Sequence, residues 1–404
     1  MATTYDVTVV GGGIVGLAVA LQLASSYPRL KLAVVEKEAE LASHQTGHNS
    51  GVIHSGIYYR PGSQKAQLCV AGARLLKDFC DQHGVKYELT GKVIVATTEA
   101  ELPALETLYQ RGAANGVEGL QMIGVERLRE LEPHTRGVKA LHAPKTGIID
   151  FSKVAQAYGA EVRQQGVEVL TRTKVLAIRR SDNSLRLETT QGDISTAYLI
   201  NCAGLYSDAV ARMAGLRPGV RIIPFRGEYY KMVPAREHLV KGLIYPVPNP
   251  KFPFLGVHFT RMMRGGVEAG PNAVLAYARQ GYRKTDIHLG ELAGTVAFRG
   301  FWAMAAKYWK TGMGEVYRSL IKSSFTHSLQ KLVPEVQSQD LAAGGSGVRA
   351  QAVDRKGTLL DDFSIVESER AIHVLNAPSP AATASLAIGR HIAGLAGQSF
   401  GLAR

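Results

Sequence analysis

The sequence predicts an α/β (α+β) fold in which a Rossmann-like dinucleotide-binding domain is interleaved with a second domain built on a mixed sheet. The first observation is that residues 5–36 read as strand, glycine turn, helix and strand, the opening of a doubly wound sheet. The second is that this alternation stops after residue 36, and polar, strand-rich and helical stretches follow from residue 43 without a repeat. A chain of 404 residues is long enough for two or three domains.

The composition is close to the average of soluble globular proteins, with 46% hydrophobic and 20% charged residues. The net charge of +13 suits an anionic membrane surface, a nucleic acid or an acidic substrate, although a solvated basic surface is its commonest meaning. Cys69, Cys80 and Cys202 form no C-x-x-C pair, so we expect neither a disulfide framework nor a metal site. We therefore expect a cytoplasmic protein, with peripheral contact to the inner face of the cytoplasmic membrane as an option.

The opening unit is built from short, strongly apolar segments. Residues 7–10 predict a valine-rich strand, residues 14–24 a helix that Pro28 closes, and residues 32–36 a second strand. The apolar run over residues 5–24 is as long as a membrane span, but three consecutive glycines interrupt it. A buried strand, a tight turn and a buried helix therefore explain this run better.

The later elements follow from apolar periodicity and turn residues. We expect helices at residues 65–83, 101–115, 125–131, 152–166 and 381–396, and a mainly helical region at 286–333. We expect strands at residues 92–96, 167–170, 175–180, 185–190 and 197–201, and strand-rich regions at 220–275 and 344–376. No linker separates these elements, so we expect two interleaved domains. The dinucleotide-binding domain is assigned residues 1–84, 146–221 and 340–404, and the second, substrate-binding domain residues 85–145 and 222–339.

The glycine turn carries the clearest functional signal. Residues 11–16, GGGIVG, fit G-x-G-x-x-G, in which Gly11 permits the tight turn, Gly13 lets a pyrophosphate approach the backbone and Gly16 lets helix and strand pack closely. The helix start then offers free N–H groups to the phosphates. Glu36 ends the next strand and can accept hydrogen bonds from ribose hydroxyls, whereas its charge would repel the 2′-phosphate of NADP.

Three further segments favour FAD over NAD. Residues 43–62 are polar, rich in glycine and dense in histidine, unlike a second nucleotide-binding unit. Residues 201–208, NCAGLYSD, end a strand in a turn of small residues that can return to the dinucleotide. Residues 376–383, NAPSPAAT, follow another strand and open the last helix, whose start could face an anionic isoalloxazine. Two helix starts aimed at one cofactor suit FAD.

Four stretches spread over the chain carry a family resemblance. They are HQTGHNSGVIHSGIYY at 44–59, IIPFRGEYY at 222–230, YPVP with FPFLGVHFT and GPNAVLA within 245–276, and GVRAQAV with NAPSPAAT at 347–353 and 376–383. The chain resembles FAD-dependent oxidoreductases of the D-amino-acid oxidase and glycerol-3-phosphate dehydrogenase type, and among them the L-2-hydroxyglutarate dehydrogenases. The resemblance implies a non-covalent FAD, oxidation of L-2-hydroxyglutarate to 2-oxoglutarate, and electron transfer to a membrane quinone or O₂. Residues 343–346, AGGS, depart from it where a proline-containing run is expected, and residues 286–333 match more loosely.

The motifs and the resemblance together name the residues expected to contact FAD. They are Gly11, Gly13, Ile14, Val15, Gly16, Glu36, Lys37, Thr46, Asn49, Ser50, Gly51, Val175, Ala203, Gly204, Arg349, Ser379, Pro380, Ala381, Ala382 and Thr383.

The expected reaction moves a hydride from the substrate Cα to flavin N5 while a base takes the hydroxyl proton. A dicarboxylate substrate calls for cationic anchors, and Arg226 and Arg349 are the candidates because guanidinium groups bind carboxylates bidentately. For the base we expect either His54 or His258, without a choice between them. The candidate substrate contacts that remain are Tyr58, Tyr59, Tyr229 and Asn272.

Other functions stay open on the sequence alone. A related flavoenzyme could oxidise a small amino acid such as glycine or sarcosine, or glycerol 3-phosphate. A nucleic-acid-binding role is disfavoured because the basic residues do not cluster and no aromatic-rich strand predicts a stacking platform. The helix expected at 298–322 mixes aromatic with basic residues, which suits an anionic lipid surface, although such helices more often cover a domain.

Overall fold

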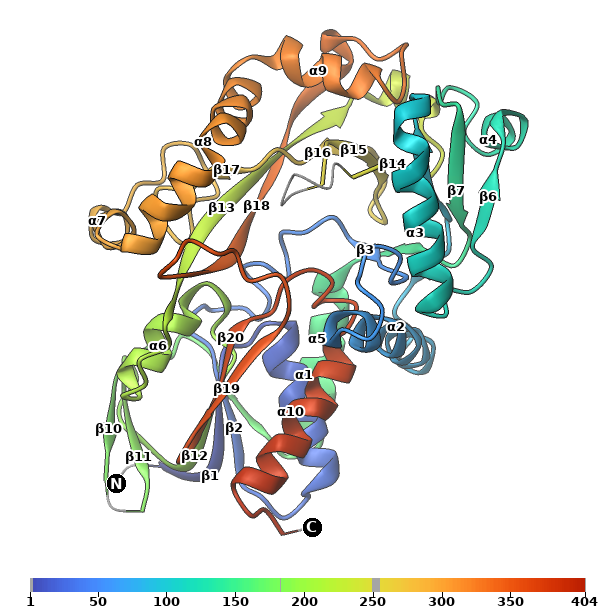
Figure 1. The fold of residues 1–404 in the computed structure, drawn as a ribbon. Coiled ribbons are helices and arrows are strands. Elements are labelled where there is room, and N and C mark those ends of the chain that lie inside the picture. The colour runs from blue at the N-terminus through green and yellow to red at the C-terminus, as the bar shows by residue number, and fades with distance from the viewer. Residues whose placement is uncertain (1–2, 182, 249–254, 404) are drawn as a thin grey trace.

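The computed structural model describes residues 3–181, 183–248 and 255–403. Figure 1 shows two sheets, one in each half of the molecule, with helices packed against each of them. Both sheets combine strands from distant parts of the sequence, so the chain passes repeatedly between the two halves. This arrangement confirms the predicted α/β class with its mixed sheets.

The first sheet is built around β1, which lies between β2 and β12 and runs parallel to both. The strand order is β10–β11–β12–β1–β2–β9, with β20 also paired to β12 and β19 to β20. The strands are β1 (Thr3–Val10), β2 (Leu32–Val35), β9 (Glu168–Leu170), β10 (Val175–Arg180), β11 (Leu185–Thr189), β12 (Ile194–Asn201), β19 (Ser364–Ser368) and β20 (Ala371–Asn376). Buried, β-branched runs such as Val34 and Val35 suit a sheet covered on both faces.

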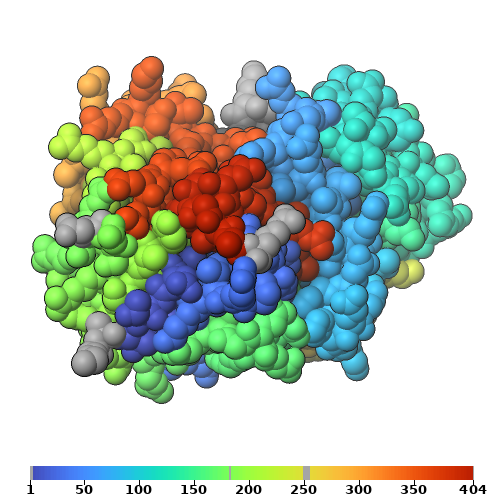
Figure 2. Space-filling view, turned by 90° about the horizontal axis from the view of Figure 1, so that it is seen from below, coloured from blue at the N-terminus to red at the C-terminus, as the bar shows by residue number. Residues whose placement is uncertain are grey.

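The main core lies between this sheet and a group of helices. They are α1 (Ile14–Ser26), α2 (Gln64–His83), α5 (Phe151–Gln164) and α10 (Ser385–Ser399). Helix α1 is apolar on nearly every side, because the sheet, α5 and α10 all cover it. Figure 2 shows from below that segments from the two ends of the chain lie side by side on the surface.

Contact between α1 and α10 depends on Gly389, and a matched glycine in the same helix allows a test. A Cβ atom on Gly389 would lie 2.6 Å from the backbone oxygen of Ala18, whereas a Cβ on Gly394 would meet nothing within 4 Å. We expect Gly389→Ala to lower the free energy of unfolding by about 1–3 kcal/mol, because two backbones must separate. Gly394→Ala should raise it by about 0.5–1 kcal/mol through helix propensity. Urea unfolding checks both values, and equal effects would contradict this packing.

The second sheet contains the long antiparallel pair β13 (Val220–Met232) and β18 (Leu341–Asp354), which Figure 1 shows rising between the two halves. The strand order is β17–β13–β16–β15–β14–β5–β7–β6, with β18 on β13. The other strands are β5 (Lys92–Ala96), β6 (Gln121–Ile123), β7 (Lys139–Ala143), β14 (Leu243–Pro246), β15 (His258–Arg261), β16 (Val267–Gly270) and β17 (Val274–Leu275). A small sheet links β3 (Val52–Ile53), β8 (Gly147–Ile149) and β4 (Tyr87–Glu88).

The remaining helices cover the second half and the junction between the sheets. They are α3 (Leu102–Ala114), α4 (Val125–Leu131), α6 (Ser207–Met213), α7 (Leu289–Val296), α8 (Arg299–Leu320) and α9 (Lys322–Gln330). The helical region expected at 286–333 is therefore present. The expected start of the last helix at residue 381 is wrong, because turns at residues 379–384 precede α10. None of the described helices is both long and apolar enough to cross a bilayer.

Candidate active site

The turn between β1 and α1 contains two glycines, Gly11 and Gly16, that no residue with a side chain could replace without a clash with the protein backbone. Gly11 has φ +115°, and a Cβ atom there would lie 2.4 Å from the backbone oxygen of Cys202, at the end of β12. A Cβ atom on Gly16 would lie 2.0 Å from the backbone oxygen of Gly11. Strand and helix can therefore approach this closely only with glycine at both positions.

Gly13 differs from both, because nothing in the described part of the chain requires a glycine there. Its backbone is extended, with φ −80° and ψ 173°, and the nearest atom to a Cβ would be Oγ1 of Thr46 at 3.4 Å. Gly13 is the N-cap of α1 without a capping side chain, and the next residue, Ile14, donates its N–H to the Thr46 hydroxyl. A glycine that no neighbour forces on the backbone, at a helix N-terminus, fits the close approach of a dinucleotide pyrophosphate.

Glu36 follows β2 and lies buried beside the glycine turn. Its Oε2 accepts a hydrogen bond of 2.7 Å from the N–H of Gly12, and its Oε1 one of 2.9 Å from the N–H of Glu38. Each carboxylate oxygen has a second lone pair, so Glu36 can still accept from ribose hydroxyls. Neighbouring Lys37 forms an ion pair with Glu38 and lies 2.9 Å from Nε2 of His44.

The polar loop at 44–51 is folded by its own side chains next to α1. Asn49 donates from Nδ2 to the backbone oxygens of Gln45 and Thr46 and accepts from the N–H of Gly51. Gly51 has φ +63°, and a Cβ there would lie 2.6 Å from the backbone oxygen of Ile149. Asn49 and Gly51 therefore set the loop's shape, while Ser50 stays a predicted contact.

The turn after β12 lies against the same loop. The backbone N–H of Ala203 donates to Oδ1 of Asn201, and a Cβ on Gly204 would lie 2.9 Å from Oε1 of Gln45. Val175, at the start of β10, is buried in the apolar cluster that Ala203 packs against. The structure thus brings the 201–208 turn to the glycine turn and the 44–51 loop, as the sequence predicted.

The NAPSPAAT segment is fastened to the chain around His54. Oγ1 of Thr383 accepts a hydrogen bond of 3.1 Å from the N–H of His54, and Oγ of Ser379 lies 3.5 Å from Nε2 of the same histidine. Ala381 donates its N–H to the backbone oxygen of Pro378, and Ala384 donates to that of Pro380. Residues 378–384 are therefore a hydrogen-bonded turn, with Ala382 inside it, and they stay the predicted second contact of the cofactor.

His54 and His258 lie in one buried group despite their distance in sequence. Each feels the positive charge of Lys92, on β5. Burial lowers the pKa of His54 to about 3 and that of His258 to about 4, and the Lys92 charge adds to both shifts. Both imidazoles are therefore neutral near pH 7 and able to accept a proton. Nδ1 of His258 lies 2.9 Å from the backbone oxygen of Gly256, a contact that leaves Nε2 as the free acceptor.

Arg349 lies on β18, opposite Phe225 of β13. Burial lowers the pKa of its guanidinium, and the electrostatic influences on it include Tyr229 and Tyr59. Arg349 is itself exposed to solvent. Because an accessible guanidinium can bind a carboxylate bidentately, Arg349 stays the predicted anchor for the substrate.

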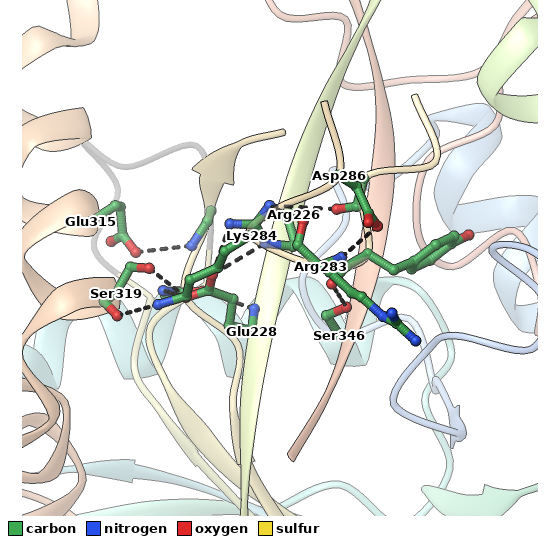
Figure 3. A network of polar contacts seen from close by, with 12 residues as sticks. Arg226, Glu228, Arg283, Lys284, Asp286, Glu315, Ser319 and Ser346 are labelled. Atoms are coloured by element: carbon green, nitrogen blue, oxygen red, sulfur yellow. Dashed lines mark hydrogen bonds and ion pairs between the residues drawn. The ribbon is translucent and has the colours of Figure 1, made fainter. Parts of the chain in front are cut away.

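Arg226 and Asn272 belong to a different network, shown in Figure 3. Arg226 donates a hydrogen bond from Nη2 to Oε1 of Glu228 over 2.9 Å and also donates from Nη1 to the backbone oxygen of Arg283. Asn272 donates to the same Glu228 carboxylate, as does the hydroxyl of Ser319. Burial would raise the pKa of Glu228, but these hydrogen bonds hold it below its usual value. The contacts favour a structural role for Arg226 and Asn272 over the substrate contacts we expected.

Lys92 and Tyr245 also lie beside the two histidines, and the sequence analysis did not predict either as a site residue. Lys92 is 2% exposed, and its Nζ lies 4.6 Å from the ring centroids of both Tyr58 and Tyr245. The Tyr245 ring in turn stacks on His258, with centroids 3.8 Å apart. The sequence contains one indication of a buried lysine, namely that Lys92 opens the apolar strand KVIVA. A lysine at the start of a short strand can equally lie at the surface, so this indication was not decisive.

Comparison with known proteins agrees with this geometry. The family model described as FAD dependent oxidoreductase matches residues 6–395. The chain is 54% identical to L-2-hydroxyglutarate dehydrogenase of Indibacter alkaliphilus over 95% of this chain and 97% of that one. It is 44% identical to the mitochondrial L-2-hydroxyglutarate dehydrogenase of Homo sapiens over 99% of this chain and 90% of that one.

A solved structure shares the fold over nearly the full length. It is the dithionite-reduced L-α-glycerophosphate oxidase of Mycoplasma pneumoniae with FAD bound, at TM-score 0.79 and 25% identity, covering 97% of this chain and 94% of that one. The family match and the FAD-bound solved structure confirm the predicted cofactor, FAD. Gly13, Glu36 and the segment 376–383 stay the predicted FAD contacts. The chain belongs to the DAO family of FAD-dependent oxidoreductases, in the branch of the L-2-hydroxyglutarate dehydrogenases.

Proposed function

We propose that the protein oxidises L-2-hydroxyglutarate to 2-oxoglutarate. The observation that carries the proposal is that the cations Arg349 and Lys92 accompany the neutral imidazoles of His54 and His258. Two cations match a substrate with two carboxylates, and a neutral imidazole matches the proton that its hydroxyl must lose. Relatives of 44–54% identity carry the name of this activity.

The chain's own residues bind the substrate and move the proton. When bound, FAD supplies the two-electron oxidant that takes the Cα hydrogen as a hydride. Arg349 holds a carboxylate, which orients the Cα–H bond, and one imidazole accepts the hydroxyl proton as the C=O bond forms. The C–H and O–H bonds break, and the product is 2-oxoglutarate. Thr383 and Ser379 hold His54 beside the cofactor segment.

A substrate panel tests the proposal against its rivals. We expect L-2-hydroxyglutarate to bleach the flavin of the anaerobic enzyme, and D-2-hydroxyglutarate, glycine and sarcosine to leave it yellow. Glycerol 3-phosphate is the second candidate, because it is also a dianion and the M. pneumoniae oxidase shares the fold. Bleaching by glycerol 3-phosphate alone would replace the proposed function with that one.

We also infer that α8 docks on an anionic membrane and so gives electrons a route to a quinone. Figure 1 places α7 and α8 at the outer edge of the molecule. One face of α8 exposes large apolar side chains, and the single acid of the helix, Glu315, is buried. Those side chains are Trp302, Trp309, Met313, Val316, Tyr317 and Leu320. Basic residues flank them, namely Arg299, Lys307, Lys310, Arg318 and Lys322. Exposed tryptophans among cations suit a lipid headgroup region.

Vesicle binding tests this surface. We expect the enzyme to co-sediment with phosphatidylglycerol-containing vesicles and to be released by salt, and the double variant Trp309→Glu/Met313→Glu to lose at least about tenfold in affinity through lost apolar burial and added repulsion. Leu176→Glu, at another exposed apolar side chain on β10, is the matched control and should bind normally. Equal binding by both variants would rule out α8 as the docking face and leave O₂ as the favoured acceptor.

A further inference from the structure

Lys92 is a buried cation that the fold surrounds with aromatic rings and imidazoles. It opens β5 and pairs in register with Leu243 of β14 and Ala143 of β7, so its backbone is fixed in mid-sheet. Its ammonium lies between the rings of Tyr58 and Tyr245. Two aromatic faces stabilise a cation, but they do not neutralise its charge.

No acidic side chain among the described residues forms an ion pair with Lys92. A buried ammonium without an anion is costly, and most such groups in proteins are paired. The hydroxyl of Tyr58 is also buried, and it has no hydrogen-bond partner in the described part of the chain. It is thus a second polar group at this place that a bound ligand could satisfy. Both groups can bind one carboxylate, which accepts from the ammonium and from the phenol.

We propose that Lys92, with the hydroxyl of Tyr58, binds the second carboxylate of the substrate and thereby selects dicarboxylic over monocarboxylic 2-hydroxy acids. The inference rests on the proposed function and names its specificity residue. Tyr245 is near Lys92 and also influences Tyr229, which in turn is near Arg349. Tyr245 and Tyr229 therefore connect the surroundings of Lys92 with those of Arg349, and the two cations supply one positive charge for each carboxylate.

The charge state of Lys92 links binding to pH. Burial lowers the pKa of Lys92 to about 7, and a bound carboxylate must raise it again because the ion pair favours the charged form. Binding at pH 8 therefore takes up a proton, and kcat/KM for the dianion should fall as the pH rises above about 7. The titratable groups that face Lys92 from the elements around it are His54, Tyr58, Cys69, Tyr245 and His258. None of them gains a proton at pH 8, since the imidazoles titrate far below and the phenols and thiol far above.

Substrate discrimination is the first test, on the FAD-loaded enzyme. We expect Lys92→Met to lower kcat/KM for L-2-hydroxyglutarate about 100-fold or more, mainly through KM, and to leave L-2-hydroxyvalerate, which lacks the second carboxylate, nearly unchanged. Lys65→Met is the matched control, because Lys65 also lies over a tyrosine ring but has its own partner in Asp361. An unchanged preference in Lys92→Met would overturn the proposal.

Calorimetry on the wild-type holoenzyme is the second test and needs no variant or turnover. Glutarate binding at pH 8, measured in two buffers of different ionisation enthalpy, should take up close to one proton, and valerate should take up none. Glutarate binding without proton uptake, or no glutarate binding, would overturn the role of Lys92. Failure of the wild-type enzyme to oxidise L-2-hydroxyglutarate would instead overturn the proposed function, whichever result glutarate gives.

Discussion

The double variant His54→Gln/His258→Gln should keep its FAD and be reduced by L-2-hydroxyglutarate about 10²–10⁴-fold more slowly than the wild-type enzyme, the usual cost of losing a general base. Glutamine can keep hydrogen bonds of the imidazole but cannot take a proton at neutral pH. The FAD anchors should survive, because His54 reaches Thr383 through its backbone N–H and not its ring. Stopped-flow measurement of anaerobic flavin reduction gives the rate constant.

The single variants then identify the base. One proton leaves the substrate hydroxyl per turnover, so one of the two single variants should show most of the decrease in the rate of flavin reduction. Nδ1 of His258 lies against the backbone oxygen of Gly256, so Nε2 is the nitrogen left to accept a proton, whereas the ring of His54 lies beside Ser379. His134→Gln, on a surface histidine paired with Glu335, should reduce at the wild-type rate. Normal reduction in the double variant would remove both imidazoles from proton transfer.

The pH dependence of kcat/KM gives an independent check on the same residues. A base must be deprotonated to act, so activity is lost as the pH falls through its pKa in the free enzyme. Because burial and Lys92 lower these pKa values to about 3 for His54 and about 4 for His258, the acid limb should lie well below pH 6. An acid limb at the ordinary histidine value near 6.5 would contradict the buried site.

Gly13→Val should abolish FAD retention without unfolding the protein. The backbone of Gly13 is extended, a conformation that valine readily adopts, and a Cβ there meets only Oγ1 of Thr46 at 3.4 Å. The added methyl groups would instead occupy the space in front of α1, where the pyrophosphate approaches the backbone. We expect at least about 100-fold weaker FAD binding, with an apoprotein melting temperature within a few degrees of wild type.

Two other glycines make this result interpretable. Gly16→Val places side-chain atoms on the backbone oxygen of Gly11, so it should destabilise the apoprotein as well. Gly312→Val, in the open middle of α8, should leave FAD binding intact. Flavin absorbance after gel filtration measures retention, and circular dichroism follows the unfolding of each apoprotein. A yellow Gly13→Val protein would show that the pyrophosphate lies elsewhere.

Local signals predicted those parts of the fold whose contacts are close in sequence. The β1–α1–β2 opening, the roles of Gly11 and Gly16, and the position of Glu36 follow from residues within one supersecondary unit. The start of the last helix could not be placed, because the turns at 378–384 are held by hydrogen bonds to residues 52–54, far away in sequence. Propensity alone cannot weigh such a contact.

The sequence by itself determined the fold class, the dinucleotide site and the family, because motif spacing, turn residues and long family motifs are all patterns of residues that are close in sequence. Only the tertiary structure decided which charges meet. It brought Asn272 and Ser319 to the Glu228 carboxylate and gave Lys92 a buried position among tyrosines and histidines contributed by separate strands and loops. Charge and pKa depend on burial and on neighbours within a few ångströms, and those neighbours are set by strand pairing across the second sheet and not by order in the sequence.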